Sequence, residues 1–199
     1  MVANGPKLND TTRQKWTEAE RLAALSSYDI LDTQPEQPFD DLARLAALMC
    51  RAPIALVNFV AESRQWFKAE VGFGRSETPL DIAFCTHVIL QPHLFVVPDT
   101  TKDARFDCNP LVTDEPFVRF YAGSPLLTGD GLPLGTLCVL DYTPRLGLTP
   151  QEGEVLLALA RQCSVLLEYR RALRRLDSAR RIGDQRSKRH RYASRKLQR

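Results

Sequence analysis

Residues 118–141 read VRFYAGSPLLTGDGLPLGTLCVLD, and they end the stretch from Pro79 to Asp141 that decides the fold. Two strand-like runs, 119–127 and 134–141, flank a turn with two glycines, which is a hairpin signal. An apolar run at 94–97 precedes a polar loop that carries Asp, Arg, Asn and Cys. The sequence therefore predicts a sheet with a polar loop over one face, a common position for a small-molecule pocket.

The segments before this stretch predict an α+β fold. Apolar residues from Phe39 to Met49 recur at helical spacing, and Ile54 to Val60 is a β-branched, apolar strand. Residues 65–70 are its expected hairpin partner, and a short helix is expected at 82–90. Since hairpin-linked strands alternate with helices, we expect one antiparallel sheet flanked by helices.

Several segments, in the same order, resemble a GAF domain of the type found at the N-terminus of bacterial sensor histidine kinases and cyclic-dinucleotide enzymes. The segments are 21–33 (RLAALSSYDILDT), 39–42 (FDDL), 53–60 (PIALVNFV), 64–69 (RQWFKA) and the stretch described above. The resemblance covers most of the chain and implies a GAF-like antiparallel β-sheet flanked by helices, with a long C-terminal helix. It implies a role in signal transduction but names no ligand, because one fold carries many functions.

The chain is expected to divide into four parts. Residues 1–17 are polar and predicted to be disordered, and the GAF domain is expected at 18–168. A helical, coiled-coil-like extension is predicted at 169–183, followed by a basic flexible tail at 184–199.

A long helix is predicted to begin at the capping-box signature formed by Thr149, Pro150 and Glu152. An apolar stripe follows, with three leucines seven residues apart, and it is expected to end near Gly183. Its members are Leu159, Leu166, Leu173, Tyr169 and Leu176. A heptad stripe of this kind predicts a homodimer through paired helices.

Composition and charge bound the protein class. Apolar residues make up 44% of the chain, no apolar run approaches the roughly 20 residues that cross a bilayer, and no secretory signal is visible, so a cytoplasmic location is expected. Residues 1–169 carry 14 basic and 22 acidic residues, whereas residues 170–199 carry 13 basic and 2 acidic ones. The basic tail is therefore expected to contact polyanions such as nucleic acid, an anionic membrane or an acidic partner.

The predicted ligand pocket lies between the sheet and the loop 99–111. Strand aromatics are expected to form its apolar wall, and polar loop residues its rim. The candidate ligand-binding residues are Phe59, Phe84, Cys85, His87, Asp103, Arg105, Asn109, Phe120 and Tyr121. The loop residues also have structural alternatives, since Asn109 can cap a turn and Arg105 can pair with Asp103.

No metal or cofactor is predicted. Cys85 and His87 are two residues apart, so they face different sides of a helix, and no second pair has zinc spacing. Phytochrome-like GAF domains usually attach bilin at a Cys-His dipeptide, and Cys108 is followed by Asn109 instead. The cysteine count is five, without a Cys-x-x-Cys, which argues against a disulfide framework.

The leading hypothesis is a regulatory module that binds a small ligand or partner and relays the signal through a dimeric C-terminal helix to a separate output protein, as in two-component signalling. The sequence has no kinase, cyclase or phosphodiesterase motif, so the chain is not expected to be an enzyme. The alternative is a thiol-based enzyme of the free methionine sulfoxide reductase type. It requires two or more of Cys85, Cys108 and Cys138 to approach one another.

Overall fold

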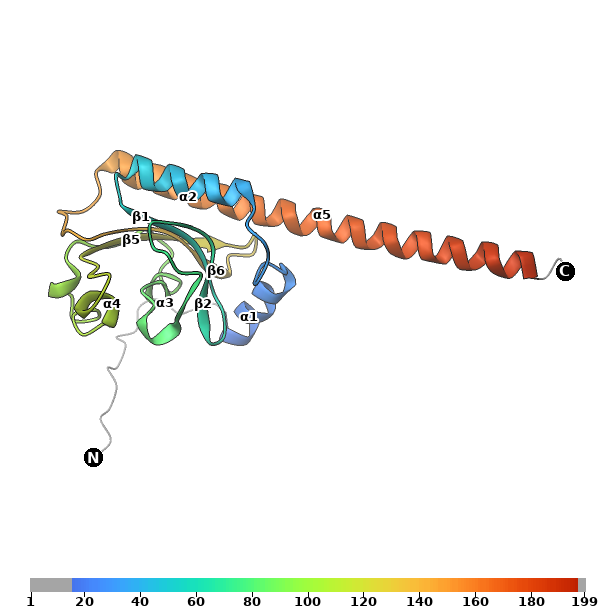
Figure 1. The fold of residues 1–199 in the computed structure, drawn as a ribbon, viewed down its shortest axis with the longest axis horizontal. Helices are drawn as coiled ribbons and strands as arrows, with labels where there is room; N and C mark the ends of the chain where they lie inside the picture. The colour runs from blue at the N-terminus through green and yellow to red at the C-terminus, as the bar shows by residue number, and fades with distance from the viewer. Residues whose placement is uncertain (1–15, 197–199) are drawn as a thin grey trace, which may run out of the picture.

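The computed structural model describes residues 16–196 of the chain, and the side chains of residues 16–181. Six strands form one sheet in the order β3-β2-β1-β6-β5-β4, and every neighbouring pair is antiparallel (Figure 1). The strands are β1 (Ile54–Val60), β2 (Arg64–Val71), β3 (Glu77–Pro79), β4 (Phe95–Val97), β5 (Phe120–Leu127) and β6 (Pro133–Asp141). This confirms the predicted α+β fold, to which the structure adds β3.

Five α-helices surround the sheet. They are α1 (Glu18–Ser27), α2 (Gln37–Met49), α3 (Cys85–Val88), α4 (Pro110–Thr113) and α5 (Pro150–Lys196), and two 3-10 turns, η1 (Leu80–Ile82) and η2 (Thr100–Lys102), lie between them. The helix expected at 82–90 is therefore only one turn long, after a separate turn at η1. Thr17, placed in the disordered N-terminal segment by the sequence, instead caps α1 through a capping box with Glu20. Residues 1–15 lie outside the described part.

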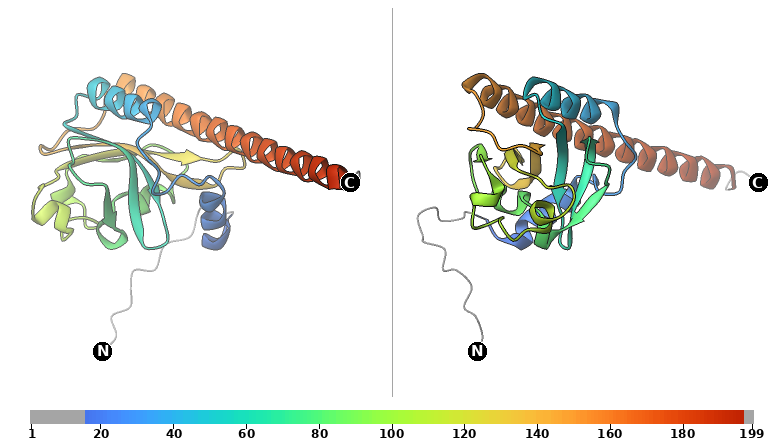
Figure 2. Two further views of the ribbon diagram at one scale, coloured as in Figure 1. Left: turned by 45° about the vertical axis from the view of Figure 1, so that its right-hand side comes forward. Right: turned by 60° about the vertical axis from the view of Figure 1, so that its left-hand side comes forward.

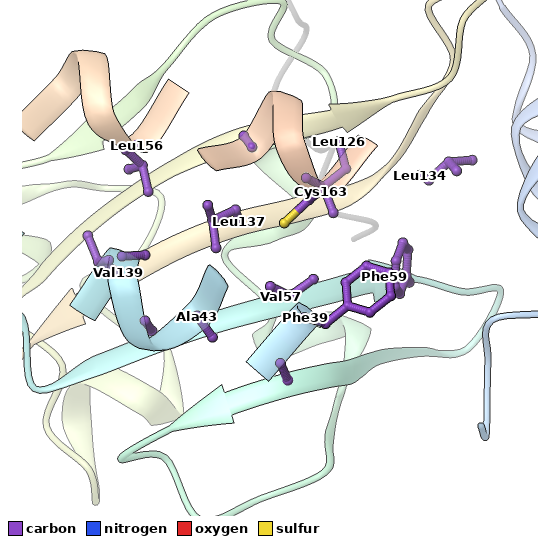
Figure 3. Close-up of a cluster of buried hydrophobic side chains, with 14 of the residues drawn as sticks. Phe39, Ala43, Val57, Phe59, Leu126, Leu134, Leu137, Val139, Leu156 and Cys163 are labelled. Atoms are coloured by element: carbon purple, nitrogen blue, oxygen red, sulfur yellow. The ribbon is translucent and has the colours of Figure 1, made fainter. Parts of the chain in front are cut away.

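The two faces of the sheet have different cover. Helices α2 and α5 lie side by side across one face, which we call the helix face (Figures 1 and 2). Helices α3 and α4 and the loop 98–118 cover the other, which we call the loop face. On the helix face, Phe39 and Ala43 of α2 and Leu156 and Cys163 of α5 meet inward side chains of β1, β5 and β6 (Figure 3).

Helix α5 begins as predicted, since the Glu152 carboxylate accepts from the backbone N–H of Thr149 at 2.8 Å. It then buries a stripe at spacings of four, three and four residues: Leu156, Ala160, Cys163 and Leu167. Past this stripe the helix leaves the domain and projects away from the sheet (Figure 1).

The predicted end of the helix near Gly183 is wrong, because α5 continues without a break to Lys196. One interior glycine costs a helix only about 1 kcal/mol relative to alanine, which neighbouring helix-forming residues offset. The backbone of the predicted flexible tail is therefore helical from residue 184 to 196. Within residues 16–196, no helix has the length and apolar character needed to span a membrane.

Candidate functional site

Five polar side chains meet on the loop face, where most of the sheet is apolar. The Cys85 sulfur accepts a hydrogen bond from Thr136 Oγ1 at 3.0 Å and lies 3.1 Å from the Tyr121 hydroxyl. Asn58 Nδ2 donates to Thr136 Oγ1 at 2.8 Å and to the sulfurs of Cys85 and Cys138 at 3.4 and 3.5 Å. We call Asn58, Cys85, Tyr121, Thr136 and Cys138 the polar cluster; all five are buried.

Strand alternation explains how the polar cluster forms. Asn58 on β1 pairs with Thr136 on β6, and Cys138 lies two residues farther along β6, so all three share one face. The ring of Tyr121 crosses over Gly123, two residues along β5. A Cβ at Gly123 would come within 2.5 Å of the Tyr121 hydroxyl. The glycine therefore leaves the space in which the hydroxyl reaches Cys85.

The two buried thiols differ in acidity. Burial opposes ionisation of Cys85, but hydrogen bonds from its four neighbours in the polar cluster lower its pKa overall. The pKa of Cys138 is raised well above its usual value, first by burial and then by Cys85. Burial also raises the pKa of Tyr121. Cys85 is therefore the thiol of the pair that loses its proton first.

A small cavity of about 10 Å³ adjoins the polar cluster, close to the space that one water molecule needs. Its walls are mainly apolar, with Gln65 and Thr78 as polar members. They comprise Leu56, Gln65, Phe67, Phe73, Thr78, Ala83, Phe84, Cys85, Leu111, Tyr121, Cys138 and Leu140. The carbonyl oxygens Asn58 Oδ1 and Gln65 Oε1 are buried and accept no hydrogen bond from the described residues. Buried polar atoms without partners are rare, so these two are notable.

Aromatic rings close the cavity on the side of the loop. The Phe84 ring stacks between Tyr121 and Phe106, with centroids at 5.2 and 4.5 Å. The edge of His87 meets Phe106 at 4.9 Å, and His87 does not line the cavity. Burial and the nearby Arg105 guanidinium lower the pKa of His87, so its imidazole is neutral at pH 7.

The predicted loop residues take the structural roles that the sequence left open. Arg105 pairs with Asp103 and lies over the rings of Phe95 and Phe106 at 4.7 and 5.3 Å. Asn109 caps α4, accepting from the Leu111 backbone N–H at 2.9 Å, and its Nδ2 donates to the Ile82 carbonyl at 3.0 Å. These contacts hold the loop over the aromatic rings, but none of Asp103, Arg105 and Asn109 lines the cavity.

Two predicted site residues lie on the wrong side of the sheet. Phe59 and Phe120 are fully buried on the helix face, with the core of α2 and α5 (Figure 3 labels Phe59). Phe120 precedes Tyr121 on β5, and successive side chains of a strand point to opposite faces. The prediction placed both on the same wall as Phe84 and Tyr121, but the sheet separates the two pairs. Of the predicted residues, Phe84, Cys85 and Tyr121 are brought together at the cavity.

Asn58, Gln65 and Thr136 were not among the residues predicted from the sequence. The available signal was a polar residue inside an otherwise apolar strand, since Asn58 interrupts residues 54–60. Such a residue needs a buried partner or a function. Cys108, considered with Cys85 and Cys138, is exposed and lies outside the polar cluster. Across residues 16–181, no three His, Cys, Asp or Glu side chains gather as metal ligands would.

A larger groove of about 360 Å³ opens on the surface elsewhere. Its walls are Phe73, Arg75, Glu115, Pro116, Phe117 and Tyr142. Its charged side chains are exposed to solvent, and neither of the two unpaired buried oxygens found among the described residues belongs to its walls. The buried cavity, with its unpaired acceptor Gln65 Oε1, is therefore the better candidate site.

Comparison with known proteins identifies the family of this fold. The family model described as GAF domain matches residues 34–167. A cyclic di-GMP phosphodiesterase of Pseudomonas aeruginosa is 39% identical over 144 residues, which are 72% of this chain and 24% of that protein. The chain thus spans about a quarter of the length of this curated relative.

Solved structures share the fold. The GAF domain of an Acinetobacter phosphoenolpyruvate-protein phosphotransferase has a TM-score of 0.58 at 16% identity, covering 78% of this chain and 95% of that one. The blue-light-absorbing form of the Thermosynechococcus elongatus PixJ GAF domain has a TM-score of 0.57 at 19% identity, covering 72% and 90%. At these identities the likeness is one of fold alone. With the family match over two thirds of its length, the chain belongs to the GAF domain family.

Proposed function

We propose that the chain is a sensory module of a signalling protein, which binds a small molecule at the cavity on the loop face. The observation that carries the proposal is the buried Gln65 Oε1, an acceptor without a partner in the wall of an otherwise apolar cavity. A ligand that supplies a donor there would offset the cost of burying this oxygen.

The size of the cavity defines how binding must occur. At about 10 Å³ it holds no metabolite as it stands, so the ligand-bound form requires the loop 98–118 and α3 to move outward. Binding would then select a more open conformation of this cover. The walls favour a compact, mainly apolar or aromatic molecule with one hydrogen-bond donor.

We further propose that the output is linked to cyclic di-GMP. The support is the relative in Pseudomonas aeruginosa, which is named as a cyclic di-GMP phosphodiesterase. This chain carries no phosphodiesterase motif, so we propose that it regulates such an activity rather than performing it. The basic residues beyond Tyr169 are proposed to add a contact with a polyanion or an acidic partner.

A thermal-shift screen with cyclic nucleotides, amino acids and small aromatic metabolites tests the ligand proposal. A true ligand at 100 times its Kd adds about 2.7 kcal/mol, or roughly 5–10 °C in Tm for a domain of this size. Gln65→Leu removes the unpaired acceptor and should weaken binding about fivefold, the value of one neutral hydrogen bond. The control Glu62→Gln, at an exposed loop residue, should leave binding unchanged. A screen without hits, or a ligand whose affinity does not change in Gln65→Leu, would contradict the proposal.

A second candidate function rests on one distance, the 4.0 Å between the sulfurs of Cys85 and Cys138. In this alternative, the Cys85 thiolate attacks the sulfur of free methionine sulfoxide, which leaves as methionine while its oxygen stays on Cys85 as a sulfenic acid. The Cys138 thiol then displaces that oxygen as water and forms a disulfide. An external dithiol must reduce the disulfide to complete the cycle.

Turnover of free methionine sulfoxide with dithiothreitol as reductant tests this alternative. If the chemistry occurs, Cys85→Ser should abolish turnover, whereas Cys108→Ser should retain it because Cys108 is exposed and outside the polar cluster. We expect the wild type to show no turnover, as a sensory module would. Turnover that depends on Cys85 would instead make the protein an enzyme.

The proposed relay runs through a dimer formed by α5. Of the predicted stripe, Leu159 and Leu166 pack partly against the core of their own domain. The exposed apolar side chains from residue 165 onward are Val165, Tyr169, Leu173 and Leu176, at 61%, 61%, 43% and 66%. Their spacing of four, four and three residues puts them on one side of the helix, which we call the α5 stripe. We propose that the α5 stripe, rather than Leu159 and Leu166, is the dimer seam.

A further inference from the structure

Lys68 is a buried cation that lies at an irregularity in the sheet. Val57 pairs with Ala69 and Asn58 with Phe67, so Lys68 is the extra residue of a β-bulge on β2. The side chain of Lys68 lies on the helix face, opposite to that of Phe67, and is 0% exposed; the bulge lets the next residue, Ala69, share this face. The preceding residue, Phe67, is a wall of the ligand cavity on the opposite face.

The ammonium group of Lys68 is held by the connector between α1 and α2. It donates to Thr33 Oγ1 at 2.8 Å, to the Gln34 carbonyl at 2.6 Å and to Glu36 Oε1 at 2.7 Å. The Phe39 ring lies 5.6 Å from the nitrogen. A buried charge is costly unless paired in this way, so the position of Lys68 and that of the connector are tied together.

The same oxygen, Glu36 Oε1, also contacts helix α5. Glu36 Oε1 accepts from Arg170 Nε at 2.9 Å, and Arg170 Nη1 donates to the carbonyls of Tyr28 and Asp29 at 2.8 and 3.0 Å. Arg170 is three residues past Leu167, the last core residue of α5 among the side chains described, which end at residue 181. Glu36 thus joins β2 to α5 at the point where α5 leaves the domain.

We propose that Lys68, Glu36 and Arg170, here called the Glu36 bridge, couple the ligand cavity to α5. When the cavity wall at Phe67 shifts, the bulge at Lys68 shifts with it, and the Glu36 carboxylate passes this displacement to Arg170. The coupling sets how firmly the first exposed turn of α5 is held against the connector. This inference assigns a route to the sensory function proposed above and rests on it.

The test needs no ligand, because a substitution in the cavity wall replaces it. Phe67→Leu removes volume from the wall. Hydrogen–deuterium exchange of the amides at 167–171 reports how firmly this part of α5 is held against the connector. We expect Phe67→Leu to speed this exchange about fivefold in the wild-type background. In the Glu36→Gln background the exchange is already fast, and Phe67→Leu should change it less than about twofold, since the route is cut.

Two controls separate coupling from general destabilisation. Exchange at residues 137–140 of β6 reports global opening, and the rates at 167–171 are compared after normalising to it. Glu154→Gln makes the same substitution at an exposed residue of α5 and should preserve the response to Phe67→Leu. If Glu36→Gln folds poorly, Arg170→Lys keeps the charge but loses the planar fork that binds three acceptors, and should cut the coupling equally.

Two results would overturn the inference. In one, Phe67→Leu speeds exchange at 167–171 equally with and without Glu36, which means that coupling takes another path. In the other, it has no local effect in either background. A failed ligand screen would instead remove the proposed sensory role while leaving the measured coupling in place, so the two failures are distinguishable.

Discussion

The double substitution Leu173→Asp with Leu176→Asp should convert the proposed dimer to a monomer. Both side chains lie on the α5 stripe beyond the domain core, so the fold of each subunit should be unaffected. A buried leucine contributes about 1.5–3 kcal/mol, and a dimer would lose four of them, about 6–12 kcal/mol in all. That corresponds to a Kd raised by more than about 10⁴-fold.

Light scattering at micromolar concentration, with the melting temperature measured in parallel, checks this result. Ser178→Asp places a carboxylate on the opposite side of α5 and should leave the proposed dimer intact. It is compared with Leu176→Asp, the single substitution that places a carboxylate on the α5 stripe. A wild type that is already monomeric at these concentrations would refute the proposed relay through paired helices.

Removing Glu36 should cost far more stability than removing Lys68. Glu36→Ala leaves the Lys68 ammonium fully buried without its carboxylate, for which we expect a loss of about 3 kcal/mol. Lys68→Met replaces the cation by an apolar chain of similar length, and Glu36, 35% exposed, keeps its bond to Arg170. That change should cost less than about 1 kcal/mol, as swaps of a buried charge for a packed apolar group often do.

The difference between wild type and Glu36→Ala should depend on pH. Burial opposes ionisation of Glu36, but hydrogen bonds from Lys68 and Arg170 lower its pKa overall. The contribution of a carboxylate with a lowered pKa is complete above its unfolded pKa of about 4.3, and it is lost as the pH falls through the folded value.

Lys68 behaves differently on the alkaline side. Burial lowers the pKa of Lys68 despite the opposing effect of Glu36, so loss of its proton at high pH relieves the cost of burying the charge. Urea unfolding from pH 3 to 10 should therefore show the largest deficit of Glu36→Ala near neutrality. A deficit that does not change with pH would mean that the carboxylate contributes by packing alone.

The sequence predicted the strands and helix starts well, because these depend on local patterns. A β-branched apolar run marked β1, the turn with two glycines marked the hairpin of β5 and β6, and the Thr149 capping box marked the start of α5. Long-range consequences were not accessible. Alternation shows that Phe120 and Tyr121 face opposite ways, but it does not say which face carries the cavity and which is covered by α2 and α5.

The Glu36 bridge illustrates a second limit of sequence reading. Lys68 in a strand reads as a solvent-facing residue, and its burial follows from the connector between α1 and α2 and from Phe39, which cover it from distant positions in the sequence. Likewise, the loop residues Asp103, Arg105 and Asn109 have the composition of a binding rim. In the structure these loop residues hold the loop in place instead, through contacts with Phe95, Phe106 and Ile82.

The length of α5 gives the protein a mechanical lever. From Arg170 to Lys196 the helix rises by about 40 Å, at 1.5 Å per residue. A tilt of only about 5° at the Glu36 bridge would therefore move the distal end by about 3.5 Å, roughly two thirds of the rise of one helical turn. Small rearrangements near the sheet need not alter the core packing. At the distal end of α5 they would still produce a displacement comparable to a change in side-chain register.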